Sequence, residues 1–344
     1  MNSEWQAFLE AQGAVIAPGG EVRFPDAPEA PECALVDLSH LGLIRISGED
    51  ANDFLQGQIT ADVRELRPDR SQLGALCSPK GRMLAEFRLF LRGGAVYLQL
   101  PAERLGPVLQ RLSMFVLRSR VELEDASDAL VRLGLAGDCA EEILPGAPTE
   151  PNGVAEVGGL TLVRLPGDRP RFEVIGPVQE MQGLWRRARL LAQPADADLW
   201  RLLEIRAGLP RVYATTAEAF VPQMANLQLV GGVSFTKGCY TGQEVVARMQ
   251  YLGKLKRRMY RVRLQCETRP EPGEPLYAPG SASGQGAGRL VEVAPSPEGG
   301  YEALAVIEIA SAEAGELHLG DAEGPEVAFA PLPYAYEAAE AAPE

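Results

Sequence analysis

With 344 residues, the chain is too long for one compact core, and two or three domains are expected. Its formal net charge of −14 opposes broad binding to nucleic acid, and no apolar run approaches the roughly 20 residues that cross a bilayer. The opening MNSEWQAFLEAQGA lacks the basic and then apolar pattern of a secretion signal. We therefore expect a cytoplasmic protein that contacts neither a membrane nor nucleic acid directly.

Cysteine and histidine usage narrows the chemistry further. The five cysteines are scattered singly, which argues against a disulfide framework, a zinc ribbon or a four-thiolate cradle for an iron–sulfur cluster. Only two histidines are present, so histidine-based metal sites and Ser-His-Asp catalysis are poorly supplied. No resident metal is expected.

The first predicted part of the chain, residues 1–125, mixes strands and helices. A strand at 43–46 ends at Gly48 and leads into a helix at 49–55 whose first turn carries acids. The elements that follow are two strands around a turn, a third strand and an amphipathic helix, at 74–77, 83–90, 96–100 and 102–114.

A second part, residues 126–254, begins with a weak repeat of the first. The strand–glycine–acidic helix pattern recurs at 130–144, which suggests two related α+β parts. Further strands and helices are predicted at 160–164, 171–175, 177–192 and 198–207. The apolar stripe of the last helix continues onto Arg206, whose guanidinium therefore needs a protein carboxylate or a ligand as acceptor.

The stretch GGVSFTKGCYTGQEVVARM at 231–249 concentrates reactive residue types. It predicts a short strand at 233–235, a turn, and a helix that starts with the capping box Thr241–Glu244. Cys239 would then lie just before a helix N-terminus, two residues from Lys237, and both the helix dipole and the ammonium favour a thiolate. Cys239 is therefore the candidate functional thiol, with Lys237 as its charge partner. A buried, inert cysteine beside an ordinary cap is the alternative.

The C-terminal part of the chain differs in its residue pattern from the rest. Seven lysines and arginines lie from Arg248 to Arg263. They form either a solvated face with charged strand edges or a site for an anionic ligand or partner. Short alternating segments separated by Gly and Pro indicate a C-terminal antiparallel β-barrel at 255–335. Residues 336–344 have the composition of a disordered acidic tail.

The octapeptide KGCYTGQE at 237–244 resembles the signature of the YgfZ family, folate-binding proteins similar to the glycine-cleavage T-protein. Supporting matches extend over nearly the whole chain, at 54–63, 80–81, 220–223, 226–227, 246–248 and 331–334. The resemblance implies two related α+β parts and a C-terminal barrel in a ring-like arrangement. It also implies a central pocket for tetrahydrofolate, and a role in the assembly or repair of iron–sulfur proteins, including those that thiomethylate tRNA.

The same resemblance implies which residues contact folate. The family's late-helix tryptophan matches Trp200, which would otherwise be interpreted as core. The position of its early tryptophan is Leu41 here, a departure that removes one stacking surface. A glutamate of the family is Arg206 here, and a guanidinium only donates hydrogen bonds where a carboxylate accepts them. The expected cofactor-binding set is completed by Tyr240, Gln243 and Arg248.

Catalysis of glycine cleavage is not expected. The Asp-Asp pair of the T-protein enzymes is replaced by Ala85-Glu86, and Glu86 alternates to the other face of its strand. We therefore expect a non-catalytic or weakly catalytic tetrahydrofolate-binding factor, whose partners are folate and iron–sulfur proteins or their assembly machinery. The alternative is a folate-dependent one-carbon (aminomethyl) transferase with rewired acid–base residues, and a scaffold that needs no thiol is a third possibility.

Overall fold

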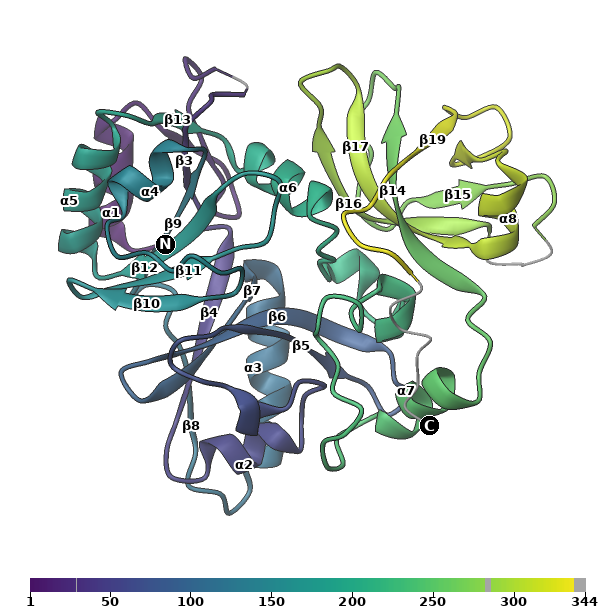
Figure 1. The fold of residues 1–344 in the computed structure, drawn as a ribbon, viewed down its shortest axis with the longest axis horizontal. Coiled ribbons are helices and arrows are strands. Elements are labelled where there is room, and N and C mark those ends of the chain that lie inside the picture. The colour runs from purple at the N-terminus through teal and green to yellow at the C-terminus, as the bar shows by residue number, and fades with distance from the viewer. Residues whose placement is uncertain (29, 282–285, 337–344) are drawn as a thin grey trace. The chain divides into compact units, whose positions relative to one another are not determined.

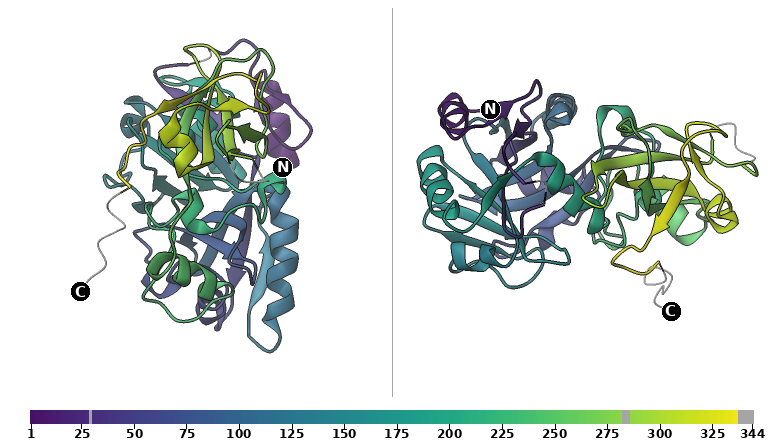
Figure 2. Two further views of the ribbon diagram at one scale, coloured as in Figure 1. Left: turned by 90° about the vertical axis from the view of Figure 1, so that its right-hand side faces the viewer. Right: turned by 90° about the horizontal axis from the view of Figure 1, so that it is seen from above.

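The computed structural model describes residues 1–28, 30–281 and 286–336 (Figures 1 and 2). The chain divides into two compact units, each assembled from separate stretches. The first unit comprises Met1–Leu55, Val63–Gln72 and Phe87–Trp200, and the second comprises Gln56–Asp62, Leu73–Glu86 and the chain from Arg201 onward. The predicted domain boundaries stay predictions, and the predicted tail lies outside the described residues except for Tyr336. In the described ranges, no helix is long and apolar enough to span a bilayer.

A six-stranded sheet forms one layer of the first unit. In spatial order its strands are β10 (Val154–Val157), β11 (Leu160–Arg164), β12 (Arg171–Gly176), β9 (Val131–Ala136), β3 (Ala34–Asp37) and β13 (Gln193–Ala195). Neighbouring strands are antiparallel except β13 and β3, which are parallel. The central strands β9 and β12 are buried along their whole length, which is typical of strands covered on both faces.

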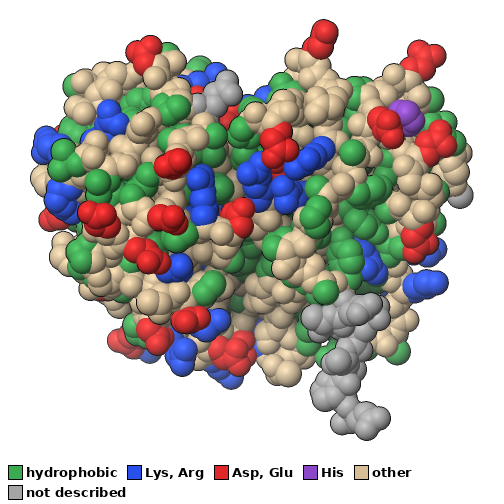
Figure 3. Space-filling view, turned by 45° about the horizontal axis from the view of Figure 1, so that its top comes forward, with side chains coloured by type: hydrophobic (Ala, Val, Ile, Leu, Met, Phe, Trp, Pro, Cys, Tyr) green, Lys and Arg blue, Asp and Glu red, His purple; other side chains and the backbone are tan. Residues whose placement is uncertain are grey.

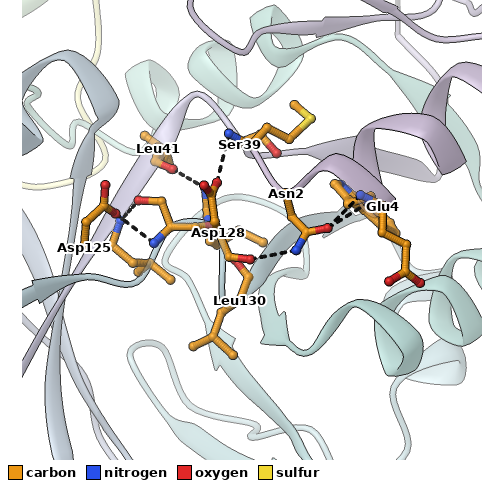
Figure 4. A network of polar contacts seen from close by, with 12 residues as sticks. Asn2, Glu4, Ser39, Leu41, Asp125, Asp128 and Leu130 are labelled. Carbon is orange, nitrogen blue, oxygen red and sulfur yellow. Dashed lines mark hydrogen bonds and ion pairs between the residues drawn. The ribbon is translucent and has the colours of Figure 1, made fainter.

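Three helices lie on one side of this sheet (Figure 1), namely α1 (Ser3–Ala11), α4 (Cys139–Ile143) and α5 (Val178–Ala188). Helix α1 begins after Asn2, whose side chain accepts hydrogen bonds from the backbone N–H groups of Glu4 and Trp5. The Asn2 amide also donates to the carbonyl oxygen of Asp128 at 2.9 Å (Figure 4). Trp5 and Trp185 meet edge to face in the apolar core below these helices. A short hairpin, β1 (Val15–Ile16) and β2 (Val22–Arg23), follows α1.

A five-stranded sheet has the spatial order β5 (Gln72–Cys77), β6 (Met83–Arg92), β7 (Ala95–Pro101), β4 (Leu41–Ser47) and β8 (Glu122–Asp125). The boundary between the units falls within β6. Helix α3 (Ala102–Val116) packs on β4, β7 and β8. Of its predicted apolar stripe, Leu105, Val108 and Leu112 are buried and Leu109 is half-buried. The predicted strand pair around the turn 78–81 is confirmed as β5 and β6.

The predicted strand–glycine–helix repeat is present in the structure. Strand β4 leads through Gly48 to α2 (Ala51–Gln56), as β9 leads through Gly137 to α4. The two glycines have φ angles of 111° and 114°. A Cβ atom would lie 2.1 Å from a backbone carbonyl oxygen in each case, that of Arg120 for Gly48 and that of Glu32 for Gly137. These matching environments support the predicted relation between the two α+β parts.

The C-terminal sheet of the second unit is curled but open, so the predicted closed barrel is wrong. Its strands, in spatial order, are β18 (His318–Leu319), β15 (Pro275–Tyr277), β16 (Gly288–Pro295), β17 (Tyr301–Glu308), β14 (Arg257–Leu264) and β19 (Val327–Ala330). The edge strand β18 has two residues, and the isolated bridge between His318 and Glu326 is too short to close the sheet. The predicted ring-like arrangement stays a prediction.

The remaining helical segments are divided between the two units. They are α6 (Ala197–Arg206), which crosses the unit boundary, then η1 (Val63–Glu65) of the first unit, and η2 (Ala214–Thr216), η3 (Pro222–Ala225), α7 (Gln243–Tyr251) and α8 (Ile309–Ala314). An apolar core joins α6, η3 and α7 to β5 and to the half-barrel strands β14, β16 and β17. On the face drawn in Figure 3, acidic and basic side chains are interspersed.

One cysteine pair was not predicted by the spacing of the cysteines. Cys33, directly before β3, and Cys139, the first residue of α4, lie at disulfide distance with their Cα atoms 6.0 Å apart.

Candidate functional site

Lys237 anchors the predicted motif from inside the second unit. Its side chain is buried, and Nζ donates hydrogen bonds to the carbonyl oxygens of Ile59 at 2.8 Å and Ala61 at 2.5 Å. The ammonium also lies 5.3 Å from the centre of the Tyr240 ring, which is a cation–π distance. A buried ammonium is costly unless it is paired, so these contacts determine the path of the loop. Burial raises the pKa of the Tyr240 hydroxyl above its ordinary value.

Thr60 adds a second attachment between the motif and the upstream chain. Its hydroxyl donates to the carbonyl oxygen of Gly232 at 2.6 Å and accepts from the N–H of Ala75 in β5 at 2.8 Å. Its own carbonyl oxygen accepts from the N–H of Ser234 at 2.9 Å. The short segment around Thr60 therefore connects β5 to the loop that carries the thiol.

Helix α7 begins two residues later than predicted. Its N-cap residue is Gly242, with a φ of 83°, and no side chain caps the helix, so the predicted Thr241–Glu244 capping box is wrong. The predicted strand at 233–235 is also wrong, because the chain there is irregular. Packing explains the later start of the helix. A Cβ at Gly242 would lie 2.4 Å from the carbonyl oxygen of Ser78, so the β5–β6 turn determines where the helix begins.

Cys239 lies in this irregular loop as an exposed, free cysteine. Cys239 is therefore not buried, and its role as a functional thiol with Lys237 as charge partner stays a prediction. Next to it, the backbone N–H of Tyr240 donates to the side-chain carbonyl of Gln243 at 3.3 Å, and the expected cofactor contacts of these two residues stay predictions. A thiol that reacts with a partner or reagent must be reachable from solvent, and Cys239 meets that requirement.

Arg206, in the last turn of α6, has a protein carboxylate as its acceptor. Its Nε and Nη2 donate to Oε1 of Glu302 at 3.1 and 2.6 Å, while Arg261 binds Oε2 of the same carboxylate. Burial by itself would raise the pKa of Glu302, but the two guanidinium groups outweigh it and hold the pKa below its ordinary value. The predicted need of Arg206 for an acceptor is thus met within the protein, and its contact with folate stays a prediction.

Other members of the cation run also pair with carboxylates of the same unit. The pairs are Arg248 with Glu244 at 2.6 Å, Arg257 with Glu308 at 3.0 Å, and Arg263 with Glu298 at 3.2 Å. Together with Arg261, four of the seven cations are therefore engaged in ion pairs, which favours the structural interpretation for them. The expected contact of Arg248 with folate is untested.

The residues that replace the T-protein acid pair are both buried. Ala85 lies in the apolar core of the second unit, and Oε2 of Glu86 accepts from Nη1 of Arg211 at 3.3 Å. The other end of that guanidinium donates to Glu204 at 2.8 Å. Glu86 is therefore held in an internal ion-pair network, where an uncompensated charge would be expensive.

Glu292 is a further buried carboxyl group of this unit, and its pKa is raised toward neutrality. The hydroxyl of Tyr213 lies 2.8 Å from both carboxylate oxygens of Glu292, at the point where the register of β16 against β17 shifts. Burial raises the pKa of Glu292 to about 7, despite the nearby Arg201 and the hydrogen bond from Tyr213.

Trp200, the predicted stacking residue, and Leu41, which stands at the position of the family's early tryptophan, belong to the first unit. Trp200 is 1% exposed and lies against the backbone of β9, since a Cβ at Gly134 would be 2.5 Å from the ring. The guanidinium of Arg171 lies 5.5 Å from the ring centre. Strand register places Thr161 of β11 on the same face of the six-stranded sheet as Gly134.

The opposing sheet face carries Leu41. The register of β4 with β7 puts Leu41 and Gln99 on one face of the five-stranded sheet, and the register of β7 with β6 adds Arg92 to it. Because Arg92 donates to Thr161 at 2.6 Å, this face is turned toward the sheet that carries Trp200. In addition, Arg132 of β9 donates to the carbonyl oxygen of Leu41 at 2.6 Å (Figure 4).

Two buried side chains between the six-stranded and the five-stranded sheet, Gln99 and Trp200, have polar atoms that no described residue pairs by a hydrogen bond. Both amide atoms of Gln99, which has no exposed surface, and Nε1 of Trp200 are without a partner among the described residues. An unpaired buried polar group costs about 1–3 kcal/mol, so such groups point to a ligand or water that satisfies them. Gln99 is not among the site residues predicted from the sequence, where its signal is a single polar residue within the apolar strand VYLQL.

The fold defines the class of protein. A family model described as the GCVT N-terminal domain matches residues 30–151. The crystal structure of glycine cleavage system aminomethyltransferase T from Bartonella henselae superposes with a TM-score of 0.76 at 18% identity, over 97% of this chain and 98% of that one. The chain therefore has the fold of the aminomethyltransferase T class.

Sequence relatives identify the family within that class. The tRNA-modifying protein YgfZ of Colwellia psychrerythraea is 37% identical over 250 residues, which cover 71% of this chain and 76% of that protein. The tRNA-modifying protein YgfZ of Yersinia pestis is 32% identical over 314 residues, 90% of this chain and 95% of that protein. This chain belongs to the YgfZ family, as its octapeptide predicted.

Proposed function

We propose that this protein is a tRNA-modification factor that binds tetrahydrofolate and supports the assembly or repair of iron–sulfur enzymes, with Cys239 as its functional thiol. The observation that carries the proposal is an exposed, free thiol on a loop anchored by a buried lysine. Such a thiol is reachable by a protein client while its position is held constant. The similarity to YgfZ relatives over most of the chain supports the tRNA-related part.

The residues of the first unit fit tetrahydrofolate. Its pterin ring is flat and has an amide-like edge that presents donors and an acceptor side by side, and Gln99 offers an unpaired acceptor and donor in return. The indole N–H of Trp200 is a further unpaired donor, and Leu41 supplies an apolar surface on the facing sheet. When bound, the folate supplies a carrier for one-carbon units, while these residues bind and orient its ring and exclude water from it.

Calorimetric titration with tetrahydrofolate tests the ligand. We expect Gln99→Leu and Trp200→Ala each to weaken binding about tenfold or more, because each removes a buried hydrogen-bonding group from the proposed site. Gln99→Leu is also expected to raise the stability of the unliganded protein by about 1 kcal/mol, since it removes an unpaired amide. No heat from the native protein would rule out tetrahydrofolate as the ligand, and binding as tight as that of the native protein in both variants would rule out this site.

Complementation tests the thiol. In a bacterial strain that lacks its own YgfZ, the native chain should restore thiomethylated nucleosides in tRNA, measured by mass spectrometry, and Cys239→Ala should not. Cys266→Ala is the matched control, because Cys266 is a free, half-buried cysteine outside the motif. Full activity of Cys239→Ala would favour a scaffold that needs no thiol. Turnover of an aminomethyl donor with tetrahydrofolate would instead revive the one-carbon transferase, although Glu86 is held by Arg211.

A further inference from the structure

Cys33 and Cys139 form a pair outside the proposed folate and thiol sites. They are 106 residues apart in sequence, yet their Cα atoms lie 6.0 Å apart, inside the range of about 4.4–6.8 Å over which a disulfide forms without backbone movement. Both belong to the first unit, whereas Cys239 belongs to the second. The proposed role of Cys239 therefore does not explain this pair.

The fold brings these two residues together through strand register. Strand β3 pairs with β9 so that Ala34 lies opposite Ala136, which places Cys33 opposite Gly137, two residues before Cys139. The chains approach closely at this point because Gly137 has no side chain, and a Cβ there would lie 3.0 Å from the Cα of Cys33. The proximity is thus a product of the central strand pairing and not of an exposed loop.

The surroundings allow the pair to exist in either redox state. Both cysteines are half-buried, so a small reagent in solvent reaches them, and both pack against the apolar core of the first unit. That core contains many fully buried apolar side chains from α1, α5 and the six-stranded sheet. Because this core holds both segments in place, the sulfurs remain adjacent when they are not joined.

We infer that Cys33 and Cys139 are an oxidative modification site whose substrate is a hydroperoxide. One thiolate attacks a peroxide oxygen, the O–O bond breaks, and the products are a sulfenic acid and, after protonation, water. The other thiol then attacks that sulfur, the S–O bond breaks, the S–S bond forms and a second water leaves. The net change is two thiols and one hydrogen peroxide to one disulfide and two waters. A dithiol reductant then restores the two thiols by exchange and is itself oxidised to a disulfide.

The link has a defined mechanical effect. It fastens the start of β3, and with it the N-terminal segment that contains α1, to the β9–α4 corner. Closing a loop of this length restricts the unfolded chain, so the oxidised protein should melt about 5 °C or more above the reduced one. The modification therefore stabilises the first unit under oxidising conditions without consuming the Cys239 thiol.

Hydrogen peroxide added to the fully reduced, full-length protein tests the site. We expect a mass loss of 2 Da, a fall from five titratable thiols to three after denaturation, and a peptide map that joins Cys33 to Cys139. The conservative variants Cys33→Ser and Cys139→Ser should each lose both the cross-link and the rise in melting temperature. Cys266→Ser, which alters a half-buried cysteine elsewhere, should keep both.

Two results would overturn the inference. One is addition of oxygen to Cys239 or Cys266 with no cross-link between Cys33 and Cys139. The other is a cross-link that forms but leaves the melting temperature unchanged in the native chain. Because Cys239→Ala should still form the cross-link, failure of the proposed thiol function and failure of this inference are distinguishable.

Discussion

Arg206 of α6 donates two hydrogen bonds to a single oxygen of Glu302, a residue 96 positions later in β17. The second oxygen is bound in the same way by Arg261 of the neighbouring strand β14. One buried carboxylate thus ties a helix to the half-barrel of the second unit. The guanidinium of Arg206 is thereby part of the internal structure of the second unit, while its predicted contact with folate stays a prediction.

Replacing Glu302 with glutamine should destabilise the protein by about 3 kcal/mol, because two largely buried guanidinium groups lose their counter-charge. The control is Glu298→Gln, whose partner Arg263 is half exposed, and there the loss should stay below about 1 kcal/mol. Urea unfolding of the three proteins measures both values. Equal, small losses for the two variants would show that the Arg206–Glu302–Arg261 contact contributes little.

Glu292 should make stability fall as pH rises toward neutrality. Its pKa is about 7 in the folded protein against an ordinary 4.5, so between these values the folded carboxyl keeps a proton that the unfolded one has lost. The stabilisation is complete below pH 4.5 and is lost as pH rises through 7, with a total near 3 kcal/mol, roughly 1.4 kcal/mol per pKa unit. Unfolding free energies of the native chain and Glu292→Gln across pH 4–8 measure it, and a constant difference between them would contradict the assignment.

Gly81 should tolerate alanine less well than Gly93, although both are turn glycines with positive φ angles, 68° and 54°. A Cβ at Gly81 would lie 2.7 Å from the Cβ of Val245 in α7, whereas nothing lies within 4 Å of the same position at Gly93. Gly93→Ala should therefore cost about 1 kcal/mol from backbone strain alone, and Gly81→Ala about 2–4 kcal/mol. Thermal unfolding compares the two, and faster hydrogen exchange confined to α7 should accompany only the Gly81 change.

Lys237→Met should loosen the thiol loop. The change leaves the carbonyl oxygens of Ile59 and Ala61 without their donor in a buried place, at a cost of about 2–3 kcal/mol. Hydrogen exchange over residues 232–240 should rise accordingly. Lys256→Met is the matched control, because Lys256 is exposed, and its effect should lie within about 0.5 kcal/mol. Unchanged exchange in the Lys237 variant would mean that Thr60 alone holds the loop.

Local patterns in the sequence predicted local structure well. The apolar spacing of α3, the β5–β6 hairpin and the two strand–glycine–helix units follow from contacts between residues close in the chain. The capping box failed because Gly242 packs against the distant turn at Ser78. Closure of the barrel failed because it depends on how two edge strands meet, which no single strand pattern encodes.

The site residues also divide into those that a local sequence pattern predicts and those that depend on contacts between distant segments. The lysine two residues from a thiol at an expected helix start pointed to Cys239 and Lys237, and the continuation of an apolar stripe onto Arg206 predicted an acceptor for its guanidinium. The identity of that acceptor, Glu302, could not be predicted, since the two residues are far apart in sequence. Gln99 and the Cys33–Cys139 pair likewise depend on strand register between distant segments.

Because each unit is assembled from separate stretches of the chain, parts of the second unit are synthesised long before the residues that they bind. The carbonyl of Ile59 leaves the ribosome 178 residues before the ammonium of Lys237 that binds it. At roughly 5–20 residues per second, this segment of the nascent chain waits on the order of ten to forty seconds for its counterpart. Throughout that interval the apolar side of β5 is exposed to chaperones. If the chain is released before residue 237, the second unit lacks the lysine that binds the carbonyl of Ile59.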